Sequence, residues 1–257
     1  GINDMDGWLE QALSLGWVVV ATDYVGLGTP GPELYLVAQA EVNDIVHSVQ
    51  AVRQWELAGA GDRYAVYGHS QGGHSSLWAG HLAEDIDPTL DLVGVAAAAP
   101  AAMLPEIVSV QWDTAAGWAI GPEALVAWRT VDPSLPLEGV VTDAGVNNYE
   151  RLADECIMLA ALEGLARNDL GQSFFAVDPV TAPGWSSVIE GQTPPPLPGV
   201  HMTTPQERHH GDRVTSRGAC GNMSRMEAEG SIHALFRRMP AYRCHGTVCD
   251  AYFTGPA

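Results

Sequence analysis

The segment from Tyr64 to Gly80, YAVYGHSQGGHSSLWAG, constrains the fold of this chain more than any other. A short β-prone run leads into the pattern Gly68-His69-Ser70-Gln71-Gly72, and a stretch with helical character follows it. This order predicts a strand, a sharp turn and a helix, with the Ser70 hydroxyl exposed at the corner. Gly68 and Gly72 carry no side chain, so the turn can be tight and the helix can approach neighbouring strands. The alternative is a glycine-rich turn in which the serine is incidental.

Strand-like and helix-like segments alternate on both sides of this turn. Residues 17–22 form a continuous apolar run, which is typical of a strand buried on both faces. We expect strands at 17–22, 64–67 and 92–99, and helices at 7–15, 38–57 and 70–83. Such alternation predicts an α/β fold with a mostly parallel sheet and helices on both of its faces.

The chain divides into three parts by the character of its sequence. Residues 1–100 are expected to form the α/β core. Residues 101–190 read as helical stretches broken by Pro and Gly, including one at 149–166, and we expect them to form a cap over the sheet. Residues 191–257 form a C-terminal segment of unusual composition.

Charge and hydropathy exclude several classes of partner. The net charge is −19, and the 12 basic residues are all arginine. A nucleic-acid-binding surface needs clustered cations, so we expect no nucleic-acid partner and no attraction to anionic membranes. No apolar run is long enough to span a bilayer. No obligate protein partner is implied.

A serine at such a turn becomes a nucleophile only with help from its neighbours. A base, commonly an imidazole, must accept its proton, and a carboxylate must orient that base. Two donors, usually backbone N–H groups, must stabilise the oxyanion. The turn supplies Ser70 as the candidate nucleophile and the N–H of Gln71 as one candidate oxyanion donor.

Several segments resemble the secretory lipase family of α/β-hydrolases. They are GWVVVATDYVGLGTPG, YLV, VRQ, YGHSQGGHSSLWAG and LVGVAAAAP, followed by DPVTAPGWSSVIEGQTPPP, in this order over roughly residues 1–200. The resemblance implies a secreted Ser-His-Asp hydrolase of lipid esters with a helical cap, no cofactor and at most transient contact with a lipid interface. The family's nucleophile falls on Ser70 and its oxyanion donor on Gln71. The second donor follows a strand further upstream, so the resemblance also implies that this chain is truncated at its N-terminus.

The acid and the base are expected in the C-terminal segment. Asp212 lies in HHGDRVTS, between Gly211 and Val214, and is the candidate acid. His245 is the candidate base, and His210 and His233 compete with it. The order Ser70, Asp212, His245 is the one found in α/β-hydrolases.

The composition changes abruptly near residue 200. Residues 201–257 hold seven of the 12 arginines, five of the 31 acidic residues and three of the four cysteines. Their Val, Ile and Leu content is so low that we expect no buried strand there. A change of reading frame in the encoding DNA is one hypothesis for this break, and resequencing tests it.

Other polar clusters are interpreted as structural. His201, His209, His210 and Asp212 fit a polar loop better than a metal site, because adjacent histidines rarely ligate one ion. No nucleotide-binding motif is present. Cys244 and Cys249 either form a bridge around His245 or are free thiols. Cys156 is either a free thiol or, by the resemblance, paired with a cysteine further upstream.

Three alternatives remain open for residues outside the turn and for the activity. Trp112, Trp118, Trp128 and Trp185 form either the core of the cap or an apolar groove for an acyl chain. His74 and His81 are interpreted as packing or surface residues. The activity is expected to be ester hydrolysis. An acyltransferase or peptidase on the same fold, or an inactive hydrolase-like fragment, is the alternative.

Overall fold

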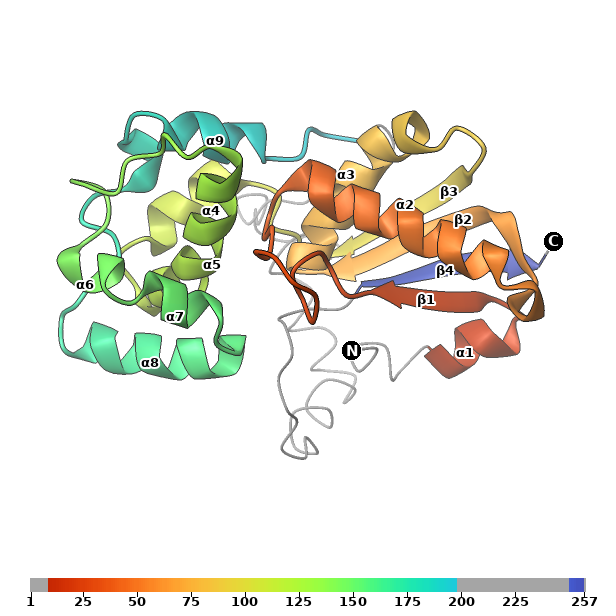
Figure 1. Cartoon of the computed structure of the whole chain (residues 1–257), viewed down its shortest axis with the longest axis horizontal. Coiled ribbons are helices and arrows are strands. Elements are labelled where there is room, and N and C mark those ends of the chain that lie inside the picture. The colour runs from red at the N-terminus through yellow and green to blue at the C-terminus, as the bar shows by residue number, and fades with distance from the viewer. Residues whose placement is uncertain (1–8, 198–249, 257) are drawn as a thin grey trace, which may run out of the picture.

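A four-stranded sheet forms the centre of one half of the molecule (Figure 1). The computed structural model describes residues 9–197 and 250–256. The strands are β1 (Val18–Thr22), β2 (Ala60–His69), β3 (Asp91–Ala98) and β4 (Asp250–Pro256), in the order β1-β4-β2-β3. β2 pairs with β3 in parallel, and β4 is antiparallel to both β1 and β2. β1, β2 and β3, the strands expected from the sequence, therefore run in one direction as predicted, and β4 runs against them.

Strand β4 corrects the expectation that residues 201–257 hold no buried strand, because it lies inside the sheet between β1 and β2. It pairs with two strands at once, so that Tyr252 is opposite both Val20 and Val66. The prediction relied on aliphatic residues alone. The sequence of β4, DAYFTGP, instead contains Tyr, Phe and Thr, which also favour extended backbone.

Helices cover both faces of the sheet. α2 (Ala38–Gln54) and α3 (Gln71–Ile86) lie on one face, and the short α1 (Leu9–Ser14) lies on the other. Alternate residues of β2 point to the two faces, so that Tyr64 and Val66 pack toward α2 and α3 while Tyr67 packs toward α1. The 3-10 turn η2 (Glu56–Ala58) connects α2 to β2.

The α2 helix shows why this side of the sheet is well packed. Its buried residues recur every three or four positions, which places them on one face of the helix. They are Ala38, Glu41, Val42, Ile45, Val46 and Val49. The stripe packs against Tyr64 and Val66 of β2 and against Ala79 and Ala83 of α3.

The cap lies beside the sheet, at the carboxyl ends of β1, β2 and β3 (Figure 1). Its helices are α4 (Leu104–Gln111), α5 (Ala115–Val131), α6 (Asp143–Val146), α7 (Tyr149–Ala153), α8 (Ile157–Asp169) and α9 (Trp185–Gly191), with a 3-10 turn η3 (Pro179–Thr181). The single helical stretch expected at 149–166 is two helices, because α7 ends before Asp154 and α8 begins after Cys156.

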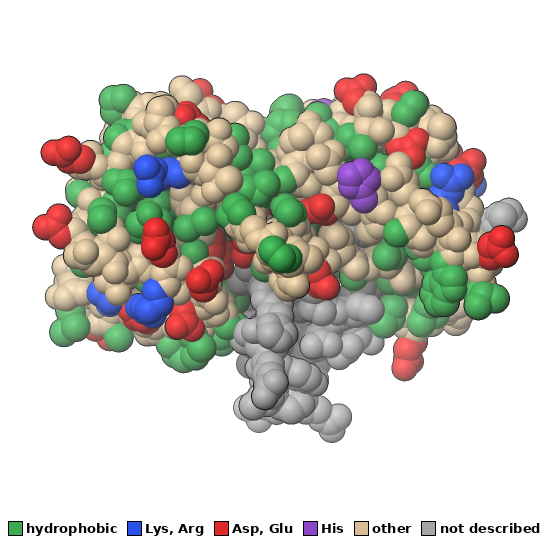
Figure 2. All heavy atoms as spheres, viewed as in Figure 1, with side chains coloured by type: hydrophobic (Ala, Val, Ile, Leu, Met, Phe, Trp, Pro, Cys, Tyr) green, Lys and Arg blue, Asp and Glu red, His purple; other side chains and the backbone are tan. Residues whose placement is uncertain are grey.

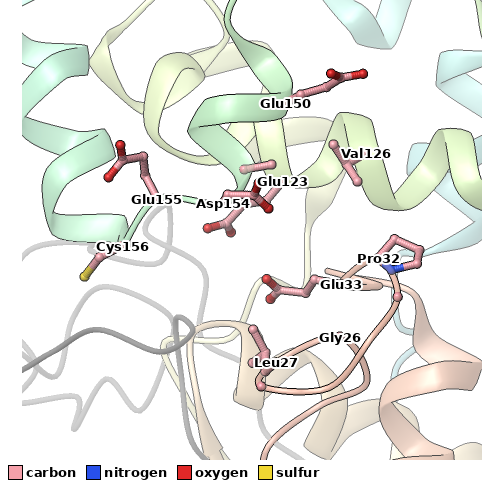
Figure 3. A pocket seen from close by; sticks show the side chains of 13 residues that line it. Gly26, Leu27, Pro32, Glu33, Glu123, Val126, Glu150, Asp154, Glu155 and Cys156 are labelled. Atoms are coloured by element: carbon pink, nitrogen blue, oxygen red, sulfur yellow. The ribbon is translucent and has the colours of Figure 1, made fainter.

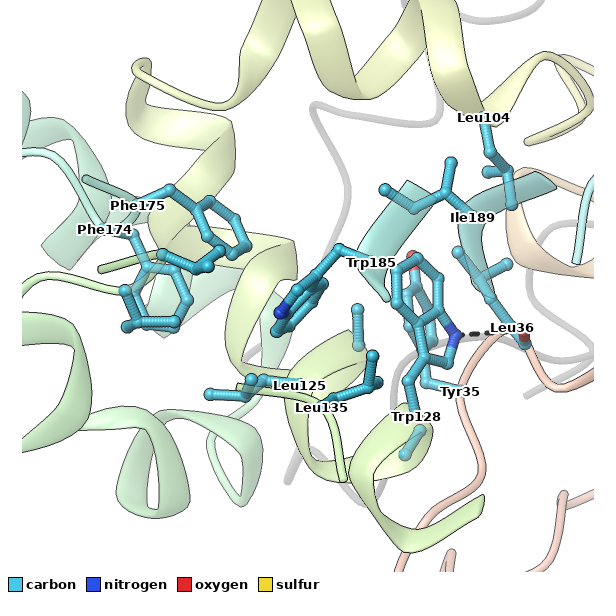
Figure 4. Packing of buried hydrophobic residues seen from close by; sticks show 14 of the residues in the cluster. Tyr35, Leu36, Leu104, Leu125, Trp128, Leu135, Phe174, Phe175, Trp185 and Ile189 are labelled. Carbon is cyan, nitrogen blue, oxygen red and sulfur yellow. Dashed lines mark hydrogen bonds between the residues drawn. The ribbon is translucent and has the colours of Figure 1, made fainter. Parts of the chain in front are cut away.

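Aromatic side chains form the core of the cap (Figure 4). Trp118 and Trp185 are completely buried, Trp128 is nearly so, and Trp112 is partly buried against the same cluster. The cluster also contains Tyr35, Leu36 and Val37, which come from the segment between β1 and α2. Trp128 donates a hydrogen bond from its indole nitrogen to the carbonyl of Leu36 at 3.2 Å. The tryptophans are thus core residues, and Trp128 also links the cap to this segment.

Candidate active site at the turn after strand β2

Ser70 is the single residue between the end of β2 and the start of α3. Its backbone has φ +57° and ψ −112°, which lies outside both the right-handed and the left-handed helical regions. The Ser70 N–H donates to the carbonyl of Ala98 at 3.0 Å. Its carbonyl accepts from the N–H of His74 at 3.1 Å and from the N–H of Ala101 at 3.2 Å. The expected strand, sharp turn and helix are confirmed, and the turn is fastened to the end of β3.

Strained backbone is concentrated around this turn. In the described part of the chain, positive φ outside glycine occurs at Leu36, Ser70 and Ala99. Ala99 directly follows the residue whose carbonyl binds the Ser70 N–H. Each such residue costs on the order of 1–3 kcal/mol and persists only where its surroundings fix it. Strain of this kind is typical of functional sites.

The close approach of helix and strand involves Gly73, one position after the motif. A Cβ at Gly73 would lie 2.8 Å from the Cα of Pro100 and 3.1 Å from the carbonyl oxygen of Ala98. The first turn of α3 therefore packs directly on the chain leaving β3, and only glycine fits there.

Gln71 is the first residue of α3, and its side chain is 1% exposed. Its N–H is one of the four that an α-helix leaves without an intrahelical acceptor. The N-terminus of a helix also favours negative charge. The Gln71 side chain donates from Nε2 to Oε1 of Glu41 at 3.0 Å. The candidate oxyanion donor, the N–H of Gln71, thus belongs to a residue whose side chain is fixed by a hydrogen bond to Glu41.

A buried polar cluster lies under the first turn of α3. Glu41, His74 and Ser75 are at most 1% exposed. Oε2 of Glu41 is 2.7 Å from Nδ1 of His74 and accepts from Oγ of Ser75 at 2.9 Å. The Tyr24 hydroxyl is 2.6 Å from the same Oγ. Nε2 of His74 is 2.7 Å from the main-chain oxygen of Gln192, which follows α9.

Glu41 was missed in the sequence, although a signal was present. It occupies the apolar stripe of α2, between Ala38 and Ile45 in the helical repeat, where a carboxylate must have partners to be buried. His74 was interpreted as a packing residue, and its complete burial confirms this. His81 donates a hydrogen bond from Nε2 to the carbonyl oxygen of Pro195 at 3.0 Å.

The other candidate site residues lie outside the described residues. These are the candidate acid Asp212, the candidate base His245 and the competing His210 and His233. Their roles beside Ser70 therefore stay predictions. The histidine cluster weighed as a metal site lies there too. Among the residues that are described, no group of three or more potential ligands could hold a metal ion. Cys156 is in a disulfide rather than free.

A cavity of about 380 Å³ lies between the loop after β1 and the cap helices α5 and α7 (Figure 3). Five carboxylates line it, those of Glu33, Glu123, Glu150, Asp154 and Glu155. Neither Ser70 nor Gln71 is among the lining residues. So acidic a lining does not suit an acyl chain. Close by, burial raises the pKa of Tyr35 well above its ordinary value, and the carboxylates of Glu123 and Glu41 raise it further. The Tyr35 hydroxyl therefore stays protonated.

The surface reflects the acidic composition. Acidic side chains are spread over both the cap and the sheet half, with fewer basic ones between them (Figure 2). In the described residues, no helix combines the length and the apolar character that crossing a bilayer demands.

Comparisons with known proteins agree with the elements described above. The profile of the family described as "Secretory lipase" matches residues 4–173. The match ends before DPVTAPGWSSVIEGQTPPP (178–196), the last of the segments for which the sequence resembles this family. Lipase A of Moesziomyces aphidis is 28% identical over 88 residues, or 34% of this chain and 18% of that protein.

One solved structure shares the fold at low identity, and a second is similar to a lesser degree. The rice cell wall degrading esterase LipA from Xanthomonas oryzae has a TM-score of 0.51 and 21% identity, over 66% of this chain and 47% of that one. Candida antarctica lipase A has a TM-score of 0.46 and 15% identity, over 62% and 38%. This chain thus spans less than half the length of each of these relatives. With a serine at the strand-to-helix turn and a family match over residues 4–173, this chain belongs to the secretory lipase family.

Proposed function

We propose that this chain carries the nucleophile of a carboxylic ester hydrolase of the lipase and esterase type. The observation that carries the proposal is the backbone of Ser70, held at φ +57° between β2 and α3. A strained residue is maintained at this corner although glycine would relax it, which is expected where a side chain is needed for chemistry. Membership of the secretory lipase family supports the same reaction.

In the proposed mechanism, Oγ of Ser70 attacks the ester carbonyl carbon. His245 accepts the hydroxyl proton and returns it to the departing alcohol, while Asp212 orients the imidazole and stabilises its charge. The N–H of Gln71 donates to the oxyanion, and the N-terminus of α3 favours the charge that develops there. Water then hydrolyses the acyl-enzyme by the same route. This sequence of steps requires no cofactor.

The substrate class is proposed to be lipid esters with medium or long acyl chains, and the site of action extracellular. Family membership and the names of the relatives support both proposals. The net charge of −19 fits a small uncharged ester better than a polyanion.

A fluorophosphonate probe tests the nucleophile directly, because it reacts with an activated serine. Mass spectrometry of the peptides should locate the label on Ser70, and Ser70→Ala should abolish both labelling and hydrolysis of p-nitrophenyl butyrate. Ser187→Ala, at an exposed serine of α9, is the matched control and should keep both. Labelling at another residue, or hydrolysis that survives Ser70→Ala, would refute the proposal.

The same hydrolysis assay tests the proposed roles of His245 and Asp212, and a change of substrate or acceptor tests the alternative activities. His245→Gln and Asp212→Asn should each lower the rate of hydrolysis by about 10³-fold or more if they complete the triad. Full activity in either variant assigns that role to another residue; for the base, His210 and His233 are the next candidates. Faster turnover with a peptide, or with an alcohol acceptor in place of water, would favour a peptidase or an acyltransferase.

A further inference from the structure

We propose that the buried carboxylate of Glu41 positions the oxyanion donor by holding the side chain of Gln71. This inference rests on the proposed function, because it concerns how the first turn of α3 is kept ready for an oxyanion. Glu41 belongs to α2 and Gln71 to α3, so the contact joins two elements that are separate in the chain.

The acceptor capacity of Glu41 is fully used. Oε1 accepts from Nε2 of Gln71 and from the N–H of Leu36, both at 3.0 Å. Oε2 contacts Oγ of Ser75 at 2.9 Å and Nδ1 of His74 at 2.7 Å. A carboxylate offers about four acceptor positions, so each has one partner. Three of the four partners lie in the first two turns of α3, which is the part of the helix that follows the nucleophile.

The same oxygen serves two strained segments. Leu36, at φ +51°, donates its N–H to the oxygen that also accepts from Gln71, which directly follows Ser70 at φ +57°. Removal of Glu41 would release both segments together. A strained conformation persists only when its surroundings over-determine it, and Glu41 supplies part of that constraint at the turn.

His74 keeps the cluster neutral and extends it to the cap. Its Nε2 faces the carbonyl oxygen of Gln192, which can only accept, so this nitrogen carries a hydrogen. One further proton lies between Nδ1 and Oε2 of Glu41, so the pair carries no net charge and can be buried. The same carbonyl accepts from Trp78 at 3.0 Å, and the side chain of Gln192 accepts from the N–H of Ala38 at 2.8 Å.

Displacement of the Gln71 N–H should affect the rate of the chemical step rather than substrate binding, because the oxyanion forms only during the reaction. The N–H of Gln71 is needed in the transition state and much less in the ground state, so a misplaced donor lowers kcat and leaves KM nearly unchanged. Loss of an entire oxyanion donor costs about 10²–10³-fold in kcat, and a donor displaced by about 1 Å should cost somewhat less, about 10- to 100-fold.

Three variants of the full chain test the inference with p-nitrophenyl butyrate. Gln71→Ala removes only the amide tether and leaves the contacts of Glu41 with His74, Ser75 and Leu36. Glu41→Gln is the conservative rescue, because its oxygen can still accept from Gln71 and Leu36 while its NH₂ donates to a neutral His74. Glu41→Ala removes every contact of the carboxylate. Gln39→Ala, at an exposed glutamine of α2, is the control.

Each rate is divided by the concentration of Ser70 that a fluorophosphonate titrates, so that unfolded protein does not count. We expect Gln71→Ala to lower kcat about 10- to 100-fold with KM within about twofold. Glu41→Gln should keep most of the activity, and Glu41→Ala should lose at least as much as Gln71→Ala. If Glu41→Ala does not fold, Gln71→Ala alone decides.

A kcat for Gln71→Ala equal to that of the unaltered chain, or a change confined to KM, would overturn the inference and leave the proposed function intact. If the unaltered chain is not labelled at Ser70, the proposed function fails and the inference fails with it.

Discussion

The strained backbone of Ser70 leads to a stability prediction that is independent of catalysis. Ser70→Gly should be more stable than Ser70→Ala, although both lack the hydroxyl. The hydroxyl makes no capping hydrogen bond to α3, so its removal alone should change stability little. The two variants then differ only in the Cβ, which is unfavourable at φ +57° and ψ −112°.

The expected difference follows from two opposing terms. A residue with a Cβ in this region costs on the order of 1–3 kcal/mol, and glycine removes that strain. Glycine also gains about 0.5–1 kcal/mol of conformational freedom in the unfolded chain relative to alanine. Glycine should therefore raise the free energy of unfolding by about 0.5–2 kcal/mol over alanine. In a chain of this size the corresponding rise in Tm is roughly 1–8 °C.

Urea unfolding of both variants, followed by circular dichroism, measures the difference. Ser187 of α9 is the matched control, because it is exposed and lies in a helix. There the sign should reverse, since glycine in a helix is about 1 kcal/mol less stable than alanine. If Ser70→Gly is as stable as Ser70→Ala or less so, the turn is not strained and the argument for the nucleophile loses its main support.

Three further perturbations test the packing around the site. Gly73→Ala would place a Cβ 2.8 Å from the Cα of Pro100. It should therefore lower the free energy of unfolding by about 1–3 kcal/mol and slow the labelling of Ser70 by a fluorophosphonate. Unchanged labelling kinetics would contradict this expectation. Burial, with a smaller effect of Asp87, raises the pKa of Tyr64 to about 12 from 10.0. The folded chain then holds this proton more tightly than the unfolded chain, so the free energy of unfolding should fall between about pH 10 and pH 12. In urea titrations, Tyr64→Phe should remove part of this decrease. Trp185→Ala should cost about 3–5 kcal/mol, because the ring is completely buried and its N–H donates to the carbonyl of Pro136 at 2.8 Å, whereas the exposed Trp55→Ala should change unfolding little.

The turn at Ser70 was predictable because local sequence dictates it. A β-prone run, glycines at fixed offsets and a helical stretch all refer to neighbouring residues, and period and turn chemistry are read over such short windows. The strands at 17–22, 64–67 and 92–99 were found within a few residues for the same reason. The boundaries moved most where hydrogen bonds extend an element, as in β2, which runs from Ala60 to His69.

The helical break at residues 154–156 and the strand β4 were not predictable by the same means. Residues 149–166 read as one helical stretch in the sequence, and the break between α7 and α8 is not recorded in that pattern. β4 has few aliphatic residues, and its pairing with β1 and β2 depends on a place in the sheet that local sequence does not record.

The residues alone were sufficient to predict the family and the strand, turn and helix around Ser70, because these depend on neighbours in the chain. The support beneath them comes from residues that are distant in sequence. Glu41 on α2, His74 on α3 and Gln192 after α9 meet only when the sheet, its helices and the cap are assembled. A buried carboxylate can be recognised as misplaced on an apolar stripe, but its partners are decided by packing, since hydrogen bonds between distant segments leave no periodic trace in the sequence.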